Sequence, residues 1–193
     1  MVLFRRRKTK AEGLQGHALA TALDDVGFWQ DVTGERDRLR DLVAAGGHPL
    51  EAMGNRGWVV DGEDLAEGLV EQLLREIAPA MARRGIPVQV GTIEGPHELG
   101  SKGYTIEVNG KLIDLYRYAP GGGMVPATAD PWTDCTLLPL ASLNEALESA
   151  GSEERIVVFG AGGNDGIAYV LPLPTVSILR SVAQGPHEIP IVA

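Results

Sequence analysis

The pattern of apolar and polar positions predicts a helix over residues 61–84. Asp61 is a favourable N-cap, and Glu63 and Asp64 lie in the first turn, where carboxylates complement the helix dipole. Pro79 is expected to kink the helix or split off its last turn. The apolar stripe recurs at helical spacing, which is typical of core packing, and consists of Leu65, Leu69, Val70, Leu73, Leu74, Ile77 and Met81. Among these residues, Leu69, Leu73 and Ile77 are predicted to be buried.

A two-residue alternation then predicts three strands over residues 88–93, 104–108 and 112–118. Asn109-Gly110 separates the last two strands and is a strong signal for a tight hairpin. The alternation assigns two faces to the third strand: Leu112, Asp114 and Tyr116 on one, and Ile113, Leu115 and Arg117 on the other. We therefore expect an antiparallel meander that continues into a proline- and glycine-rich loop over residues 119–131.

A glycine-rich turn, GAGGNDG, follows a β-branched run near the C-terminus. A dinucleotide site would need a helix directly after these glycines, because the pyrophosphate binds the free N–H groups of the helix N-terminus. The residues that follow are β-formers, and Pro172 ends the run. The sequence therefore predicts a hairpin of residues 156–159 with residues 167–171, and no nucleotide cofactor.

Further helices are predicted over residues 17–45, 137–147 and 175–183, with Thr33 capping the second of two helices in the first range and Thr175 capping the last helix. Helices mixed with hairpins favour the α+β class, here an antiparallel sheet of about five strands packed by helices. We expect a flexible basic tail over residues 1–16 and a single α+β domain over residues 17–193. Within this domain, residues 17–60 form a helical N-terminal region and residues 61–193 form the core.

Charge and cysteine content narrow the functional classes. The chain has 193 residues and a formal net charge of −9, which disfavours nucleic-acid binding. No run of residues is long and apolar enough to span a membrane, and no secretory leader follows the basic residues 5–10, so we expect a cytoplasmic protein. Cys135 is the single cysteine, which excludes an internal disulfide and a cysteine-cluster metal site.

Candidate catalytic chemistry is sparse. No GxSxG motif occurs, and the four histidines lack metal-ligand spacing, so no metal or other cofactor is expected. Two GPHE segments, at residues 95–98 and 185–188, would bind a metal only if the fold brought them together. Asp130 and Asp134 flank Cys135 and disfavour a thiolate, which indicates a buried structural cysteine.

The leading hypothesis is a non-enzymatic, cytoplasmic protein-binding module, in its most concrete form an acidic immunity or inhibitor protein that neutralises a basic partner. Its candidate partner-binding residues are the cap and turn acids Asp61, Glu63, Asp64, Glu153 and Glu154. The alternative is a hydrolase-like enzyme whose site is assembled from separate loops around the sheet, with His97, Asp114 and Tyr116 as candidate catalytic residues. Self-association into a homo-oligomer remains open.

Overall fold

Two antiparallel sheets lie on either side of a pair of helices in this computed structural model, which describes residues 14–30, 32, 34–53, 56–96 and 99–193. The α+β class predicted from the sequence is confirmed, with the strands divided between two four-stranded sheets. The predicted tail over residues 1–16 lies mostly outside the described residues.

Sheet A contains, in spatial order, β1 (Trp58–Val60), β7 (Gly166–Pro172), β6 (Glu154–Phe159) and β8 (Ile191–Val192). The predicted hairpin is confirmed, because Phe159 pairs with Ile167 and Glu154 with Pro172 across the β6–β7 ladder. No helix follows the glycine-rich turn, so the geometry of a dinucleotide site is absent there. β1 and β8 are the two edge strands of this sheet.

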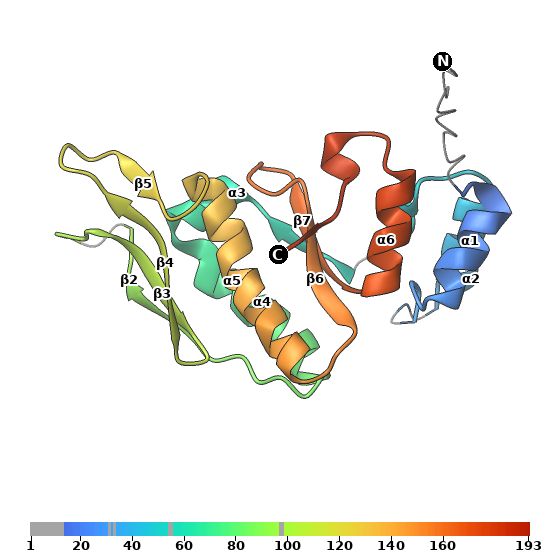
Figure 1. Cartoon of the computed structure of the whole chain (residues 1–193), viewed down its shortest axis with the longest axis horizontal. Coiled ribbons are helices and arrows are strands. Elements are labelled where there is room, and N and C mark those ends of the chain that lie inside the picture. The colour runs from blue at the N-terminus through green and yellow to red at the C-terminus, as the bar shows by residue number, and fades with distance from the viewer. Residues whose placement is uncertain (1–13, 31, 33, 54–55, 97–98) are drawn as a thin grey trace, which may run out of the picture.

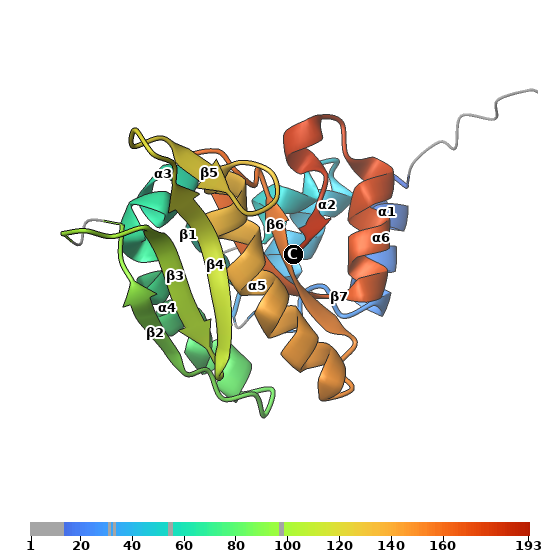
Figure 2. The ribbon, with the colours of Figure 1, turned by 60° about the vertical axis from the view of Figure 1, so that its left-hand side comes forward.

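Sheet B is a meander of β2 (Val90–Glu94), β3 (Gly103–Val108), β4 (Lys111–Tyr118) and β5 (Met124–Pro126). Asn109 and Gly110 form the predicted turn between β3 and β4, and both have positive φ. The segment over residues 119–131 was predicted to be a loop throughout, but it also supplies β5, whose Val125 pairs with Arg117. Figure 2 shows this sheet in front of the helical layer.

Helices fill two of the four layers. Between the sheets lie α3 (Gly62–Asp64), the π-helical turn η3 (Leu65–Leu69), α4 (Val70–Ala82) and α5 (Pro131–Ser149). On the far face of sheet A lie α1 (Gly16–Asp25), α2 (Arg36–Ala44), the short η1 (Pro49–Ala52) and α6 (Leu173–Val182), with η4 (Pro186–Glu188) just after it. Sheet B, the central helices, sheet A and the outer helices therefore follow one another across the molecule (Figure 1).

Strand β6 shows why two cores form. Ile156 and Val158 face the central helices, whereas Val157 and Phe159 face the outer helices, and all four residues are buried. A sheet that is covered on both faces needs apolar residues at consecutive positions, which explains the continuous run in the sequence. The N-terminal helices are fastened to the second core, where Trp29 donates its indole N–H to the Ala52 carbonyl over 3.1 Å.

The predicted helix over residues 61–84 is interrupted. Gly68, near the end of η3 and just before α4, has a φ of 120°, a conformation that residues other than glycine rarely adopt. The break changes the phase of the apolar stripe. Leu73 and Ile77 are buried as predicted, but the prediction for Leu69 was wrong, since its side chain is 44% exposed. Pro79 lies inside α4, which continues to Ala82.

Three predicted helix starts also differ. Asp130 caps α5, so this helix begins well before the predicted residue 137. Thr175, predicted to cap the last helix, is instead buried within α6, which Pro172 precedes. Thr33 lies outside the described residues, and α2 begins at Arg36.

Candidate functional site

The acids predicted to bind a partner fall into two groups at opposite ends of sheet A. Asp61 caps α3 by accepting hydrogen bonds from the Glu63 and Asp64 N–H groups, at 3.0 and 3.2 Å. The Glu63 carboxylate accepts a 3.2 Å bond from Asn164 in the loop between β6 and β7. This first group therefore lies beside the glycine-rich turn.

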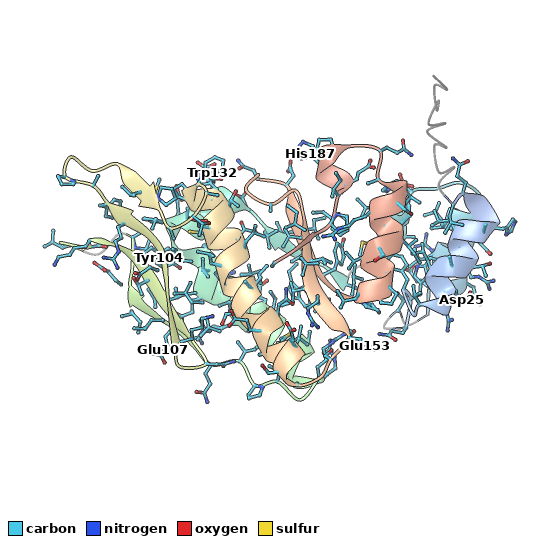
Figure 3. All side chains as sticks on the ribbon, viewed as in Figure 1. Asp25, Tyr104, Glu107, Trp132, Glu153 and His187 are labelled. Atoms are coloured by element: carbon cyan, nitrogen blue, oxygen red, sulfur yellow. The ribbon has the colours of Figure 1, made fainter. Side chains whose placement is uncertain are left out.

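The second group, Glu153 and Glu154, lies where β6 begins, at the other end of the β6–β7 ladder. Trp132 packs against Gly62, which lies between Asp61 and Glu63, and so marks the position of the first group. Figure 3 shows Trp132 and Glu153 at opposite ends of the region around α5. The five predicted acids therefore do not share one surface.

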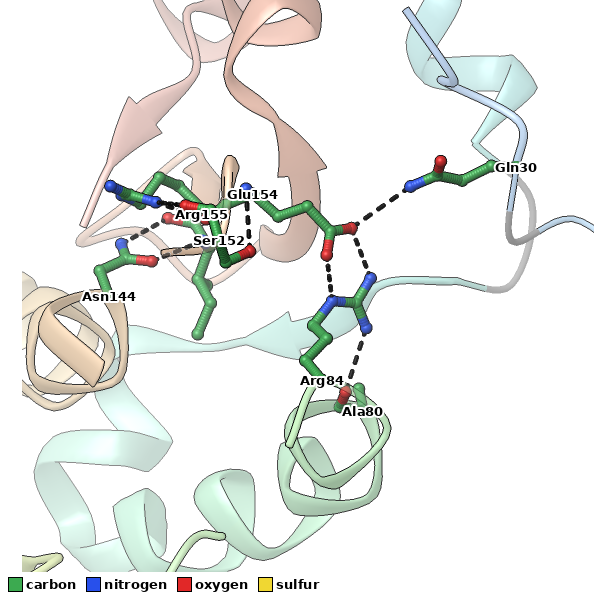
Figure 4. A network of polar contacts seen from close by, with 8 residues as sticks. Gln30, Ala80, Arg84, Asn144, Ser152, Glu154 and Arg155 are labelled. Atoms are coloured by element: carbon green, nitrogen blue, oxygen red, sulfur yellow. Dashed lines mark hydrogen bonds and ion pairs between the residues drawn. The ribbon is translucent and has the colours of Figure 1, made fainter. Parts of the chain in front are cut away.

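Glu154 is occupied by contacts within the protein. Both of its carboxylate oxygens accept hydrogen bonds from the Arg84 guanidinium at 2.6 Å, and Gln30 donates to it over 3.4 Å (Figure 4). Arg84 in turn donates to the Ala80 carbonyl at 3.0 Å. This network links the end of α4, the start of β6 and the N-terminal helices, so Glu154 stabilises the layer arrangement.

Two of the residues of the enzymatic alternative, Asp114 and Tyr116, do not share a site. Asp114 is exposed on the outer face of sheet B, where it accepts a 2.8 Å hydrogen bond from Thr105. Hydrogen bonds from Arg117 and Thr105 hold the pKa of Asp114 below its usual value. Tyr116 is buried and donates to the Ala66 carbonyl at 2.8 Å, and burial raises the pKa of its hydroxyl. His97 lies outside the described residues.

A β-bulge places Asp114 and Tyr116 on opposite faces of β4. Tyr104 pairs with Tyr116 and Thr105 with Asp114, which leaves Leu115 as an extra residue. The two-residue alternation therefore reverses after Leu115, so Tyr116 turns inward and Arg117 turns outward. The predicted shared face of Asp114 and Tyr116 was wrong for this reason. The hollow of about 190 Å³ beside Asp114 holds no free phenol, because the Tyr116 hydroxyl is bonded in the interior.

A different arrangement of charged side chains appears beside strand β1. One stripe of α4, continued from η3, runs along this edge of sheet A, and the Trp58 indole donates to the Glu76 carbonyl at 3.2 Å. The stripe and the edge strand enclose two hollows. We call the two hollows and the edge between them the β1 furrow.

The acidic hollow of the β1 furrow has a volume of about 180 Å³. Carboxylates and an amide surround an apolar floor, and none of the described lining residues is a lysine or arginine. The lining consists of Val59, Asp61, Asp64, Leu65, Leu69, Gln72, Leu73 and Glu76. Two of the predicted partner-binding acids, Asp61 and Asp64, therefore belong to this hollow.

The basic hollow lies at the other end of the β1 furrow and has a volume of about 290 Å³. Arg83 is exposed there, and its side chain makes no ion pair with a described residue. Arg56 is anchored by hydrogen bonds to the Phe28 and Met53 carbonyls. The lining consists of Arg56, Gly57, Trp58, Ala80, Arg83, Arg84, Tyr169, Val170 and Leu171.

The strand between the two hollows has an open edge. β1 pairs with β7 on one side only, and Val59 is 72% exposed. A side chain at Gly166 would lie 2.7 Å from the Val60 carbonyl oxygen, so Val60 directs this group toward β7. Because backbone groups alternate along an antiparallel strand, Val59 directs its N–H and C=O toward the open edge.

Sequence reasoning missed most of the β1 furrow. Leu69 was assigned to the core, and Arg83 was not identified as a candidate functional residue. The sequence offered two signals of the furrow: a helix-breaking glycine at Gly68, and a pair of arginines, Arg83 and Arg84, at the end of the same predicted helix. Neither signal reveals the short strand β1 that lies beside them.

Comparison with protein-family models, with curated proteins and with solved structures yields no match to this chain. Within the described ranges, no three histidine, cysteine, aspartate or glutamate side chains gather as metal ligands. Glu188 of the second GPHE segment contacts His48, with 3.3 Å between Oε2 and Nε2. Among the described helices, none is long and apolar enough to cross a membrane.

Proposed function

We propose that this protein is a non-enzymatic protein-binding module of the immunity or inhibitor type, which takes a basic segment of a partner protein at the acidic hollow. The supporting observation is that Asp61, Asp64 and Glu76 surround an apolar floor next to an unpaired strand edge. Lysine and arginine suit such a hollow, because their stems cover apolar surface while their charged ends reach carboxylates.

The charge of the whole chain supports the same partner chemistry. A net charge of −9 attracts basic proteins over long range and raises their association rate. A cytoplasmic location belongs to this proposal, since Cys135 is a buried free thiol and the fold uses no disulfide.

The first experiment measures binding of a short synthetic peptide in which lysine and valine alternate, using fluorescence anisotropy at low salt. We expect this peptide to bind the wild-type protein, and a matched glutamate–valine peptide not to bind. The double variant Asp64→Asn/Glu76→Gln should weaken binding by about five- to tenfold, because each partly exposed ion pair contributes roughly 0.2–1 kcal/mol.

The matched control is the double variant Asp25→Asn/Asp41→Asn, which removes the same charge at exposed sites on α1 and α2, away from the β1 furrow. The affinity of this control variant for the lysine–valine peptide should stay within twofold of the wild-type affinity in the same buffer. Equal weakening in both double variants would show that the peptide senses only net charge, and would contradict a binding site in the acidic hollow.

A further inference from the structure

The basic hollow has no role in the function proposed above, although it lies in the same furrow. α4 runs in the opposite direction to β1, because its first half borders Val59 and Asp61 whereas its end borders Arg56 and Trp58. Positive charge is therefore concentrated at the start of β1, and negative charge at its end.

The charges lie on both sides of the middle of the β1 furrow. Glu76 lies near the middle of the furrow, beside Trp58, and Arg83 follows it by roughly 10 Å along the helix axis. Asp61 follows Val59 on the strand by roughly 7 Å. The centre of the β1 furrow, at Val59, is apolar and exposed.

We propose that a second copy of this chain occupies the β1 furrow, with the two β1 strands paired antiparallel about Val59. A two-fold axis at this residue brings the basic hollow of each copy to the acidic hollow of the other, so the same contact forms twice. Arg83 of one copy then meets Asp64 of the second copy. The outward N–H and C=O of Val59 exchange two hydrogen bonds with Val59 of the second copy.

Charge order selects this occupant and this orientation. Parallel pairing of two β1 strands would place like charges together, whereas antiparallel pairing places opposite charges together at both ends. A basic peptide satisfies only the acidic hollow. Pairing also covers the exposed side chains of Val59 and Leu69 and removes the open edge that would otherwise invite unspecific strand addition.

This inference goes beyond the proposed function and does not depend on it, because it concerns the protein alone. The two proposals share the acidic hollow, so a basic partner and the second copy exclude each other. Sedimentation velocity over a concentration series of the purified full chain, without any partner, measures the dimer directly. We expect a reversible dimer that weakens with added salt.

A charge exchange supplies the decisive test. Arg83→Glu and Asp64→Lys should each raise the dimer dissociation constant at least tenfold, because each creates two like-charge contacts. An equimolar mixture of the two variants should form a heterodimer with near wild-type affinity, since both contacts in it are again between opposite charges. A merely unfolded variant cannot be rescued in this way.

Two further variants complete the design. Arg38→Glu reverses an exposed arginine on α2, away from the β1 furrow, and should leave the dimer unchanged. Val59→Pro removes the outward N–H and should abolish the dimer while circular dichroism stays native. A wild-type chain that stays monomeric at every concentration, or a mixture of Arg83→Glu and Asp64→Lys that stays monomeric, would overturn the proposal.

Discussion

At the scale of single residues, Asp134 fixes the loop that leads into α5. Its carboxylate is buried and accepts hydrogen bonds from the Thr128 N–H at 2.8 Å, from the Thr128 hydroxyl, and from the Ala129 N–H at 3.2 Å. Hydrogen bonds to a charged group contribute more to stability than those between neutral groups. The loop therefore depends on one carboxylate.

We expect Asp134→Ala to lower the free energy of unfolding by about 1.5–3 kcal/mol, because it removes the charged acceptor of two backbone N–H groups and a hydroxyl. Chemical denaturation of wild type and variant measures the difference. Asp134→Asn keeps one acceptor oxygen and should lose less. If Asp134→Ala unfolded at the same denaturant concentration as wild type, the loop would not rely on this contact.

The N-cap of α5 predicts a pH dependence. Hydrogen bonds from Thr133 and from the Trp132 N–H hold the pKa of Asp130 below its ordinary value near 3.8. A carboxyl whose pKa is lowered by folding stabilises the protein above its unfolded pKa, and this contribution is lost as the pH falls. Asp130→Ala should cost about 1 kcal/mol at neutral pH.

Thermal melts of wild type and Asp130→Ala at a series of pH values test this dependence. The gap in melting temperature should be constant at neutral pH and should narrow as the pH falls below about 4, where the wild-type carboxyl becomes protonated. A gap that widened toward acid would have the wrong sign.

At the scale of elements, the break at Gly68 decides which leucines of the helical stripe are core residues. Leu73 is 4% exposed within the central core, whereas Leu69 is 44% exposed in the β1 furrow. The amino-acid types are the same, so a pair of truncations separates burial from composition.

Leu73→Ala should lower the free energy of unfolding by about 2–5 kcal/mol, because it removes packed methyl groups and leaves a cavity. Leu69→Ala should change it by less than about 1 kcal/mol, since exposed apolar side chains gain little from folding. Denaturant midpoints of both variants provide the measurement. Equal losses would show that Leu69 is packed in the core like Leu73.

The elements also show how far the sequence predicts this fold. The β6–β7 hairpin was predictable because a turn-forming segment separates two runs of β-formers and a proline ends the second run. Only the second half of α5 was predictable, since the helix packs between both sheets and carries no single apolar stripe. The alternation of apolar and polar residues gives no sign of the bulge at Leu115. A glycine stands beside the bulge at Gly103, where a side chain would clash with the Tyr116 carbonyl.

At the scale of the whole molecule, neither the second sheet nor the furrow could be predicted. Strand propensity does not specify which sheet a strand joins, and here that depends on α4 and α5 lying between the two sheets. Of the furrow, Asp61 and Asp64 were identified from helix-cap chemistry alone. Leu69 and Arg83 belong to the furrow because strand β1 lies beside their helix. β1 is close to both residues in sequence, but it is too short to be recognised as a strand from the sequence.

Cys135 reports on the integrity of the central core. Its thiol is fully buried, and burial, assisted by Asp134 and Asp130, raises its pKa to about 12. A thiol-specific reagent at mildly alkaline pH should therefore label the native protein only as fast as the core opens, and the denatured protein at once. Rapid labelling of the native protein would show that α5 opens locally.

The connectivity of the two sheets sets an order of assembly during synthesis. The four strands of sheet B come from one uninterrupted stretch, residues 90–126, whereas sheet A combines β1, the β6–β7 hairpin and β8. Ile191 and Val192 of β8 pair with Val158 and Val157. A ribosome therefore releases all of sheet B before it has produced β6, and sheet A gains its last strand only when residue 192 emerges. Until then β6 is a temporary second edge of sheet A, with unpaired backbone groups that could pair with another chain.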